Sequence, residues 1–500
     1  MTRIAPAALA AAIGLALCPA YAAEPPGGED LRELVRLQAE QIRQQQAQIE
    51  RLGQRLSALE AAPAPAAGGA ATAAIAPAPA DAAADPVQAQ VQAAIAASRQ
   101  DQGTALQYQM AQAAQGGGNG GGDVRWRRGG PEFRSSDGRF SFHPRGRVAV
   151  DFSSTRGSGF DDRNIAGGTA RAVRLGAEGA IGAIGYKIDA DFADDEVSIK
   201  DAYLSYDTTL GRLPAEFYVG NKLKDRSIEG STTLTRTPFM ERNAVASVGS
   251  PEVGYFGLGA QAKLYGSNWH LGFGVAGDDL SNAGDTSDSL VYNVRAHWNP
   301  VKRGAGFLHL GGWYWYEDLA ADVGSINKVP RIALDFNDNV RVSASSISDV
   351  TDGHAWGAEF GGVHRNLWGF AEYTQRTINS STDPSVDQKA TSVYAGWLIT
   401  GEKAAFSSRS GVWGTTRVLR PLGEGGYGAF ELAARYDKYD FTDAARGGEG
   451  DSWTLGLNWY LNDWSRLMFN LVHWSTDNQV GAYQGPDSGN TLGVRAQVVF

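Results

Sequence analysis

The chain has 500 residues, of which 43% are apolar, 20% are charged and 63 are glycine, and its formal net charge is −10. This composition excludes a small disulfide-stapled scaffold and a wholly disordered chain. The mean hydropathy is −0.29, and no continuous apolar run reaches the ~20 residues that a membrane-spanning helix needs. Two classes of protein remain, a large soluble β protein and an outer-membrane β-barrel.

Residues 1–22 predict an export signal peptide. A basic start precedes an apolar run over residues 4–17, and residues 20–22 fit an A-x-A cleavage site. A lipoprotein anchored through Cys18 is the alternative, but a leucine precedes it where lipidation expects a small residue. A membrane anchor is a further alternative, and the apolar run is short for one. Cleavage leaves a mature chain without cysteine, which suits an oxidising periplasm.

Residues 23–60 predict a coiled coil. Apolar residues recur every seven positions, at Val35, Ile42, Ile49 and Leu56. Such helices pack against partners along the apolar edge, so a homo-oligomer is expected; a lone amphipathic surface helix is the alternative. Residues 61–122 are rich in Ala, Pro and Gly and predict a linker without a packed core. A periplasmic stalk of this kind allows contact with peptidoglycan.

Residues 123–500 alternate with a period of two residues. In the last ten residues, Leu492, Val494, Ala496 and Val498 share one face, and Thr491, Gly493, Arg495 and Gln497 share the other. One face of such a strand packs against apolar groups, and the other face contacts water. The apolar neighbour is the core in a soluble sandwich and lipid in an outer-membrane barrel.

Three features favour the barrel. The expected strands have ten to fourteen residues, whereas sandwich strands typically have ~5–6. Trp and Tyr stand where an aromatic girdle would lie, in the run 313–316 and at Trp368, Trp397, Trp464 and Trp474. The chain also ends on an alternating strand. Sixteen strands are expected, beginning near residues 139, 169, 183, 196, 214, 252, 268, 288, 303, 352, 366, 387, 427, 449, 464 and 489.

The pattern therefore predicts an all-β fold, a 16-stranded antiparallel transmembrane β-barrel over residues 123–500, preceded by a periplasmic coiled-coil helix. An even strand count is typical of bacterial barrels, and sixteen strands leave an open aqueous lumen. The expected location is the outer membrane of a Gram-negative cell, in contact with lipid. The acidic stretch at residues 278–288 fits an external loop near lipopolysaccharide, and binding of a divalent ion there is the alternative.

Alternation also locates basic side chains in the lumen. Residues 123–242 contain 19 basic and 18 acidic residues, whereas residues 243–500 contain 19 and 27. In the first strands the apolar residues share one face, so the alternate basic residues are expected to point inward. These are Arg145, Arg147, Arg174, Lys187 and Lys200. By the same pattern we expect Arg171 and Tyr203 to face outward.

The segment 222–242 is too long and irregular for a tight turn, and we expect it to fold into the lumen and narrow it. Its candidate anion-binding residues are Lys222, Lys224, Arg226, Thr232, Thr233, Arg236 and Arg242. Cations around a narrow passage replace the hydration of a passing anion, and several moderate sites in series let it leave. The alternative hypothesis is a general diffusion pore, in which these cations pair with nearby carboxylates.

At these residues the sequence resembles the phosphate-selective porin O/P family. The matching segments are Asp201-Ala202-Tyr203-Leu204, Val219-Gly220-Asn221, Phe239-Met240-Glu241-Arg242, 397–402 (WLITGE), 431–436 (ELAARY) and 456–460 (GLNWY). The resemblance implies a sixteen-stranded barrel, a homotrimer, and passive diffusion of phosphate or polyphosphate past a basic ladder and eyelet. It also implies that Arg242 belongs to the inward loop and that Arg174 and Lys187 lie near pore positions.

No sequence motif indicates an enzyme. The seven His show no H-x-x-x-H spacing, and the Gly-rich run 116–122 lacks the Lys-Ser/Thr of a phosphate-binding loop. A G-x-S-x-G nucleophile motif is also missing. We therefore expect no catalytic residue, no cofactor, no metal site and no nucleic-acid partner. An enzymatic outer-membrane barrel, such as a lipase, is the less favoured alternative.

Overall fold

The computed structural model describes residues 122–500, except positions 128, 194–196, 281–287, 322 and 328. The predicted signal peptide and coiled coil, and all but the last residue of the predicted linker, lie outside these residues and stay predictions. Among the described residues, no helix is both long and apolar enough to span a bilayer.

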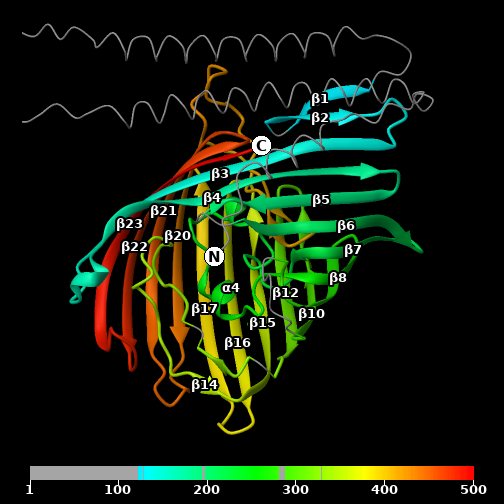
Figure 1. Ribbon diagram of the computed structural model, residues 1–500. Coiled ribbons are helices and arrows are strands. Elements are labelled where there is room, and N and C mark those ends of the chain that lie inside the picture. The colour runs from blue at the N-terminus through cyan, green and yellow to red at the C-terminus, as the bar shows by residue number, and fades with distance from the viewer. Residues whose placement is uncertain (1–121, 128, 194–196, 281–287, 322, 328) are drawn as a thin grey trace, which may run out of the picture. The chain divides into compact units, whose positions relative to one another are not determined.

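Sixteen long strands form one closed antiparallel barrel (Figure 1). Each strand pairs with the next along the chain, and the last pairs with the first, from Asn490↔Arg156 to Val499↔Arg147. The strands are β3 (Phe140–Arg156), β4 (Ala166–Ile181), β5 (Ile184–Asp191), β6 (Ser198–Leu210), β7 (Leu213–Leu223), β8 (Phe256–Tyr265), β9 (Trp269–Ala276), β10 (Leu290–Trp298), β12 (Gly306–Asp318), β15 (Val350–His364), β16 (Leu367–Ser380), β17 (Val386–Leu398), β20 (Ala429–Asp440), β21 (Glu449–Asn462), β22 (Ser465–Asn478) and β23 (Gly485–Val499). A hairpin of β1 (Asp123–Arg127) and β2 (Gly130–Arg134) extends the sheet beside β3.

The predicted 16-stranded antiparallel β-barrel is confirmed, and the sandwich alternative is wrong. Each of the sixteen strands begins within four residues of its predicted start. Closure leaves every barrel strand with a hydrogen-bonded neighbour on both sides, which backbone groups at membrane depth require.

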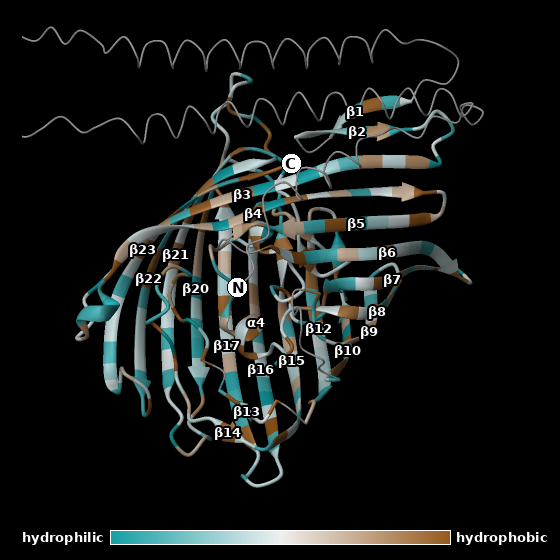
Figure 2. Ribbon diagram, viewed as in Figure 1, coloured by the Kyte–Doolittle hydropathy of each residue, from teal (hydrophilic) through white to brown (hydrophobic). Residues whose placement is uncertain are grey.

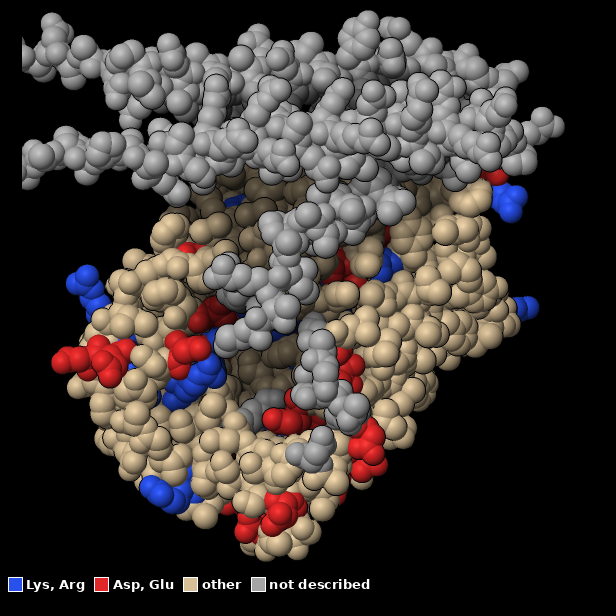
Figure 3. All heavy atoms as spheres, viewed as in Figure 1, with Lys and Arg blue, Asp and Glu red and all other residues tan. Residues whose placement is uncertain are grey.

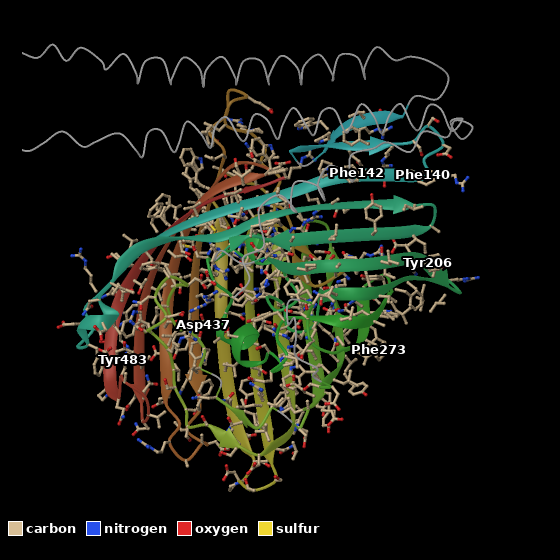
Figure 4. All side chains as sticks on the ribbon, in the orientation of Figure 1. Phe140, Phe142, Tyr206, Phe273, Asp437 and Tyr483 are labelled. Carbon is tan, nitrogen blue, oxygen red and sulfur yellow. The ribbon has the colours of Figure 1, made fainter. Side chains whose placement is uncertain are left out.

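The two faces of the strands differ as predicted. Hydrophobic and hydrophilic residues alternate along them (Figure 2). Phe140, Phe142 and Phe273 are between 41% and 49% exposed, and in Figure 4 these rings point away from the barrel, whereas the buried Asp437 lies within it. The outer surface is therefore apolar, and the inner surface carries the polar side chains.

The two ends of the barrel also differ. Short turns at residues 182–183, 211–212, 365–366 and 463–464 lie at one end, and the chain reaches Phe500 at that end. Short turns are periplasmic and long loops extracellular in barrels of this kind. One connection breaks the rule, because residues 399–428 at the short-turn end are long.

Three segments fold into the barrel. The first, here the inward loop, is residues 224–255, and it contains η3 (Leu234–Arg236) and α4 (Ala244–Val248). Figure 1 shows α4 within the ring of strands. The second is residues 319–349, with β13 (Ser325–Ile326) and β14 (Ile347–Ser348). The third lies in 399–428 and forms the hairpin of β18 (Phe406–Ser407) and β19 (Val412–Trp413).

These segments give the lumen apolar clusters of its own. The prediction of a girdle is therefore partly wrong. Trp397 and Trp464 are 45% and 42% exposed on the outside, but Trp315 and Trp474 are fully buried inside. Trp315, for example, donates to the Gly249 carbonyl of the inward loop at 2.8 Å. The sequence pattern could not separate the two groups, because an aromatic ring suits both lipid and a packed lumen.

Candidate functional site

Basic residues of β3 to β7 line one side of the lumen, here the open wall. Arg174 pairs with Asp191 at 2.6 Å. Lys187 pairs with Asp201 at 2.6 Å and with Asp189 at 3.3 Å. These pairs join neighbouring strands, so they brace the wall and neutralise part of its charge. In the view of Figure 3, basic and acidic side chains lie near one another around the central hollow, and most of the remaining described surface is uncharged.

Lys222 at the end of β7 lies between two aromatic rings. Its ammonium is 4.6 Å from the centre of the Tyr218 ring and 5.5 Å from that of Tyr203. Gly220 makes room for this arrangement, because a Cβ there would come within 3.0 Å of the Tyr203 backbone and side chain. Cation–π contact holds the ammonium without neutralising it. Cation–π contact uses none of the three N–H donors of the ammonium.

Three cations of the open wall have no ion pair with any residue that the structure describes. They are Arg147, Lys200 and Lys222. Arg147 is only 5% exposed, and the other two are half-buried. An unpaired cation with little water around it gains more from a passing anion than an exposed one does. This group has the chemistry of an anion-binding wall.

The inward loop uses its own basic residues to hold itself together. Lys224 donates to the carbonyl oxygens of Val253, Gly254 and Phe256. Burial lowers the pKa of Lys224 to about 8. Because its donors are taken by the protein, this predicted anion ligand is better described as a structural residue of the loop.

Arg226 and Arg242 of the inward loop follow the same pattern. Arg226 donates to the Ala246 carbonyl at 2.8 Å, and its guanidinium lies 4.4 Å from the Tyr255 ring centre. Arg242 donates to the carbonyls of Glu229 at 3.0 Å and Thr232 at 2.7 Å. Both guanidiniums join parts of the loop that are 10 to 20 positions apart in the chain.

The predicted threonines differ in their availability. The Thr232 hydroxyl donates to the Ile228 carbonyl at 2.7 Å and accepts the Trp413 N–H at 3.1 Å. It is 1% exposed, so it is not open to a passing anion in this conformation. Thr233 is half-buried and precedes η3, where its side chain makes no capping hydrogen bond.

Arg145 and Arg236 line a cavity of about 640 Å³ near the short-turn end. Arg145 pairs with Glu178 and lies 3.8 Å from Asp189. Thr235 and Arg466 also border the cavity. This polar cavity thus connects the inward loop with the short-turn end of the barrel.

Two β-bulges correct the predicted orientation of Arg171 and Tyr203. In the β3–β4 pairing Ala149 faces Ala172 and Val150 faces Ala170, which leaves Arg171 as the extra residue. Arg171 faces inward and pairs with Glu241 at 3.1 Å. A second bulge lies between β5 and β6, where Lys200 is the extra residue. Strict alternation fails across a bulge, so Tyr203 also turns inward, toward Lys187 and Lys222.

Sequence reasoning missed the basic residues that hold the inward loop against the wall of β20 to β23, here the covered wall. Arg495 donates to Asp151 through two bonds of 2.6 Å and to the Met240 carbonyl at 2.6 Å. Arg435 donates to the Glu241 carbonyl at 2.9 Å. Alternation alone places Arg495 on the wet face of the last strand. Its loop partners are far away in sequence, so no local signal identifies them.

Two loop carboxyl groups have opposite electrostatic environments. Burial raises the pKa of Glu229 to about 7 against the attraction of Arg435. Burial acts on Glu241 in the same direction, but Arg171 and Arg495 outweigh it and lower its pKa to about 2. Glu241 is thus a charged anchor at neutral pH. Among the residues described, no group of three or more His, Cys, Asp or Glu could hold a metal ion.

The chain is similar in sequence to known proteins and in fold to solved structures. The chain is 30% identical over 370 residues to an uncharacterized protein of Caulobacter vibrioides, covering 71% of this chain and 72% of the relative. It is 26% identical over 411 residues to Porin O of Pseudomonas aeruginosa, covering 75% and 91%. The solved structure of an anion-selective porin from Comamonas acidovorans aligns with a TM-score of 0.44 at 14% identity, covering 72% of this chain and 100% of that one. A loop-deletion mutant of OmpT, an outer-membrane protein of Vibrio cholerae, aligns with a TM-score of 0.47 at 11% identity, covering 72% and 100%.

The family model described as phosphate-selective porin O and P matches residues 142–500. This range contains nearly all of the closed sixteen-stranded barrel. The resemblance in the sequence segments is therefore confirmed, and the chain belongs to the phosphate-selective porin O and P family of outer-membrane β-barrel porins.

Proposed function

We propose that this porin passes small anions by passive diffusion, with phosphate or polyphosphate as its substrates. The observation that carries the proposal is the group of cations on the open wall, Arg147, Lys200 and Lys222, that have no ion pair among the described residues. An anion that sheds water in the lumen regains contacts from ammonium and guanidinium donors. Arg147 can meet a phosphate group through two parallel hydrogen bonds.

The paired residues of the open wall supply weaker positions in series. Arg174 and Lys187 keep part of their positive field beside Asp191 and Asp201. Arg145 and Arg236 continue the series of basic residues into the cavity near the short-turn end. Alternating cations and carboxylates keep each binding position shallow, which lets the anion move on.

The same carboxylates favour one alternative, a general and weakly selective diffusion pore. Glu178, Asp189, Asp191 and Asp201 all lie on the open wall among its cations. The sign of charge at the narrowest point decides selectivity, not the net charge of the chain. A direct measurement of ion preference separates the two functions.

The test is the reversal potential of single channels in a planar bilayer under a KCl gradient, followed by phosphate block of the chloride current. The wild-type channel should prefer chloride and be blocked by phosphate. The triple variant R147Q/K200Q/K222Q should lose most of both properties. R212Q, at an exposed turn, is the matched control and should behave as wild type. A cation-selective wild-type current that ignores phosphate would refute the transport proposal.

We also propose a homotrimer whose N-terminal segment is periplasmic. The heptad pattern at residues 23–60 supports association of several chains. Light scattering of the detergent-purified protein should give the mass of three protomers. A monomer mass that persists in mild detergent would refute this assembly.

A further inference from the structure

A shallow groove of about 620 Å³ runs along the outer face of β16 to β23 and begins at the short-turn end. Strand pairing builds its edge, because Leu367 pairs with Trp397 and Trp397 pairs with Leu432. Ala395 pairs with Ala434 on the same face, and these two small residues form the floor. The groove continues over Leu455, Phe469, Leu471 and Leu492. Its exposed side chains are all apolar, so the groove fits a hydrocarbon chain.

Three exposed basic residues lie at the start of this groove and are here called the basic rim: Arg303, Arg365 and Lys403. Hydrogen bonds hold their three turns together. The Arg365 N–H donates to the Ala305 carbonyl at 2.9 Å, and the Arg365 carbonyl accepts the Ala404 N–H at 3.3 Å. Arg365 also lies two positions before Leu367, where the edge of the groove begins. The basic rim is therefore a fixed cluster at the mouth of the groove.

The positive charge of the basic rim is not balanced locally. None of its three residues has an ion pair with any residue that the structure describes. The turns 299–305, 365–366 and 399–404 contain a single carboxylate, that of Glu402. Glu402 is only 2% exposed and accepts the Leu419 N–H at 3.3 Å. The basic rim thus presents its charge to the surface of the membrane and not to a partner in these turns.

The backbone of Arg365 is an independent sign that its side chain is used. Its φ is +55°, in the left-handed region. Residues 365–366 form the two-residue turn between β15 and β16, and such turns favour Asn or Gly at this conformation. A long side chain at such a φ is uncommon and is stabilised at the expense of the backbone, which is typical of functional positions.

We propose that the basic rim and the groove together bind an anionic phospholipid of the periplasmic leaflet. Its phosphate lies against Arg365 and Lys403, and one acyl chain follows the groove over Ala434. A guanidinium can meet the phosphate through two parallel hydrogen bonds. Charge complementarity selects this occupant, because a zwitterionic headgroup brings no net charge to the basic rim and a free phosphate leaves the groove empty. Short turns are periplasmic, so the site lies in the leaflet opposite lipopolysaccharide.

The experiment measures lipid binding to the detergent-purified full-length porin by native mass spectrometry. The probes are dioleoyl phosphatidylglycerol and its zwitterionic counterpart dioleoyl phosphatidylcholine. Wild type should bind phosphatidylglycerol at least about tenfold more tightly, because each basic residue beside an anionic lipid contributes about fivefold. R365Q/K403Q should lose this preference. R139Q/R212Q is the matched control, since it removes the same charge from exposed positions elsewhere at this end, and it should behave as wild type.

A third variant tests the groove separately from the charge. A434F fills the floor on the outer face and leaves the basic rim intact, so it should weaken phosphatidylglycerol binding severalfold. Equal affinity of wild type for the two lipids would overturn the proposal, as would equal losses in R365Q/K403Q and R139Q/R212Q. Binding that A434F leaves unchanged would overturn it too, because the acyl chain would then lie elsewhere. These readouts do not involve ion selectivity, so they stand or fall independently of the proposed transport function.

Discussion

The open wall and the covered wall use the same residue type for different purposes. Arg147 on β3 and Arg495 on β23 both face the lumen, on strands that pair with each other. Arg495 is surrounded by Asp151, Glu241 and a loop carbonyl. Arg147 has no ion pair among the described residues. A lumen-facing arginine is therefore held in ion pairs and hydrogen bonds where a loop meets it, and Arg147, which no loop residue pairs with among those described, lacks such a partner.

The same contrast occurs within three residues of the chain. Lys222 lies between tyrosine rings that leave its charge in place. Lys224 is enclosed by three backbone carbonyls, two from the inward loop and one from Phe256 at the start of β8. The difference shows that position relative to the loop, and not the basic residue itself, decides whether the donors of a cation are taken by backbone carbonyls.

The largest expected effect breaks the covered wall. R495M should lower the free energy of unfolding by about 3–5 kcal/mol, because it leaves Asp151 buried without its partner. R147M on the open wall should change it by less than about 1 kcal/mol, since no ion pair is lost. Urea unfolding in lipid vesicles measures both. Equal losses for the two variants would abolish the distinction between the walls.

A second prediction uses the pH dependence of the inward loop. The folded-state pKa of Glu229 is raised to about 7 from 4.5, so the folded state holds more protons than the unfolded state between these values. The porin should therefore lose stability as pH rises through this window, by at most about 3 kcal/mol. The pKa of Glu241 is lowered to about 2, so its contribution is complete above pH 4.5 and is lost as pH falls toward 2.

Unfolding midpoints measured across this range check both signs. E229Q should flatten the decline between pH 5 and 7. E241Q should lose stability at neutral pH and no longer respond to acid in the lower window. A decline between pH 5 and 7 that persists in E229Q would assign it to another group.

The smallest expected effect concerns Thr232. T232V removes a hydroxyl that bridges Ile228 and Trp413, and it should cost about 1–2 kcal/mol in stability. Phosphate block of the chloride current should stay as in wild type, because the hydroxyl is buried. Planar-bilayer recording of T232V measures this block. If phosphate blocks the T232V current less than the wild-type current while ion selectivity is unchanged, Thr232 contributes to anion binding.

The strands were predictable because lipid on one side and water on the other impose a period of two residues over the whole barrel. The orientation of Arg147, Arg174 and Lys187 followed from that period alone. It failed at Arg171 and Tyr203, where one extra residue in a strand reverses the alternation. A bulge leaves no clear mark in hydropathy.

The inward loop was predictable as a feature, but its internal contacts were not. Its length and irregular composition indicated that it folds into the lumen. Whether Arg242 meets an anion or the Thr232 carbonyl depends on turns that bring residues ten positions apart together. The hairpin of β18 and β19 gave no such warning, because short connections are the rule at its end of the barrel.

The ion pair of Arg495 and Asp151 lies across the seam where the first and last strands meet. Its two residues are 344 positions apart, and such distant contacts form late in folding. Arg495 also holds Glu241 and the Met240 carbonyl, so the loop must be in place when the seam shuts. Closure of the barrel and docking of the inward loop are then one step of assembly. A chain that stops before β23 lacks Arg495, the residue that joins both.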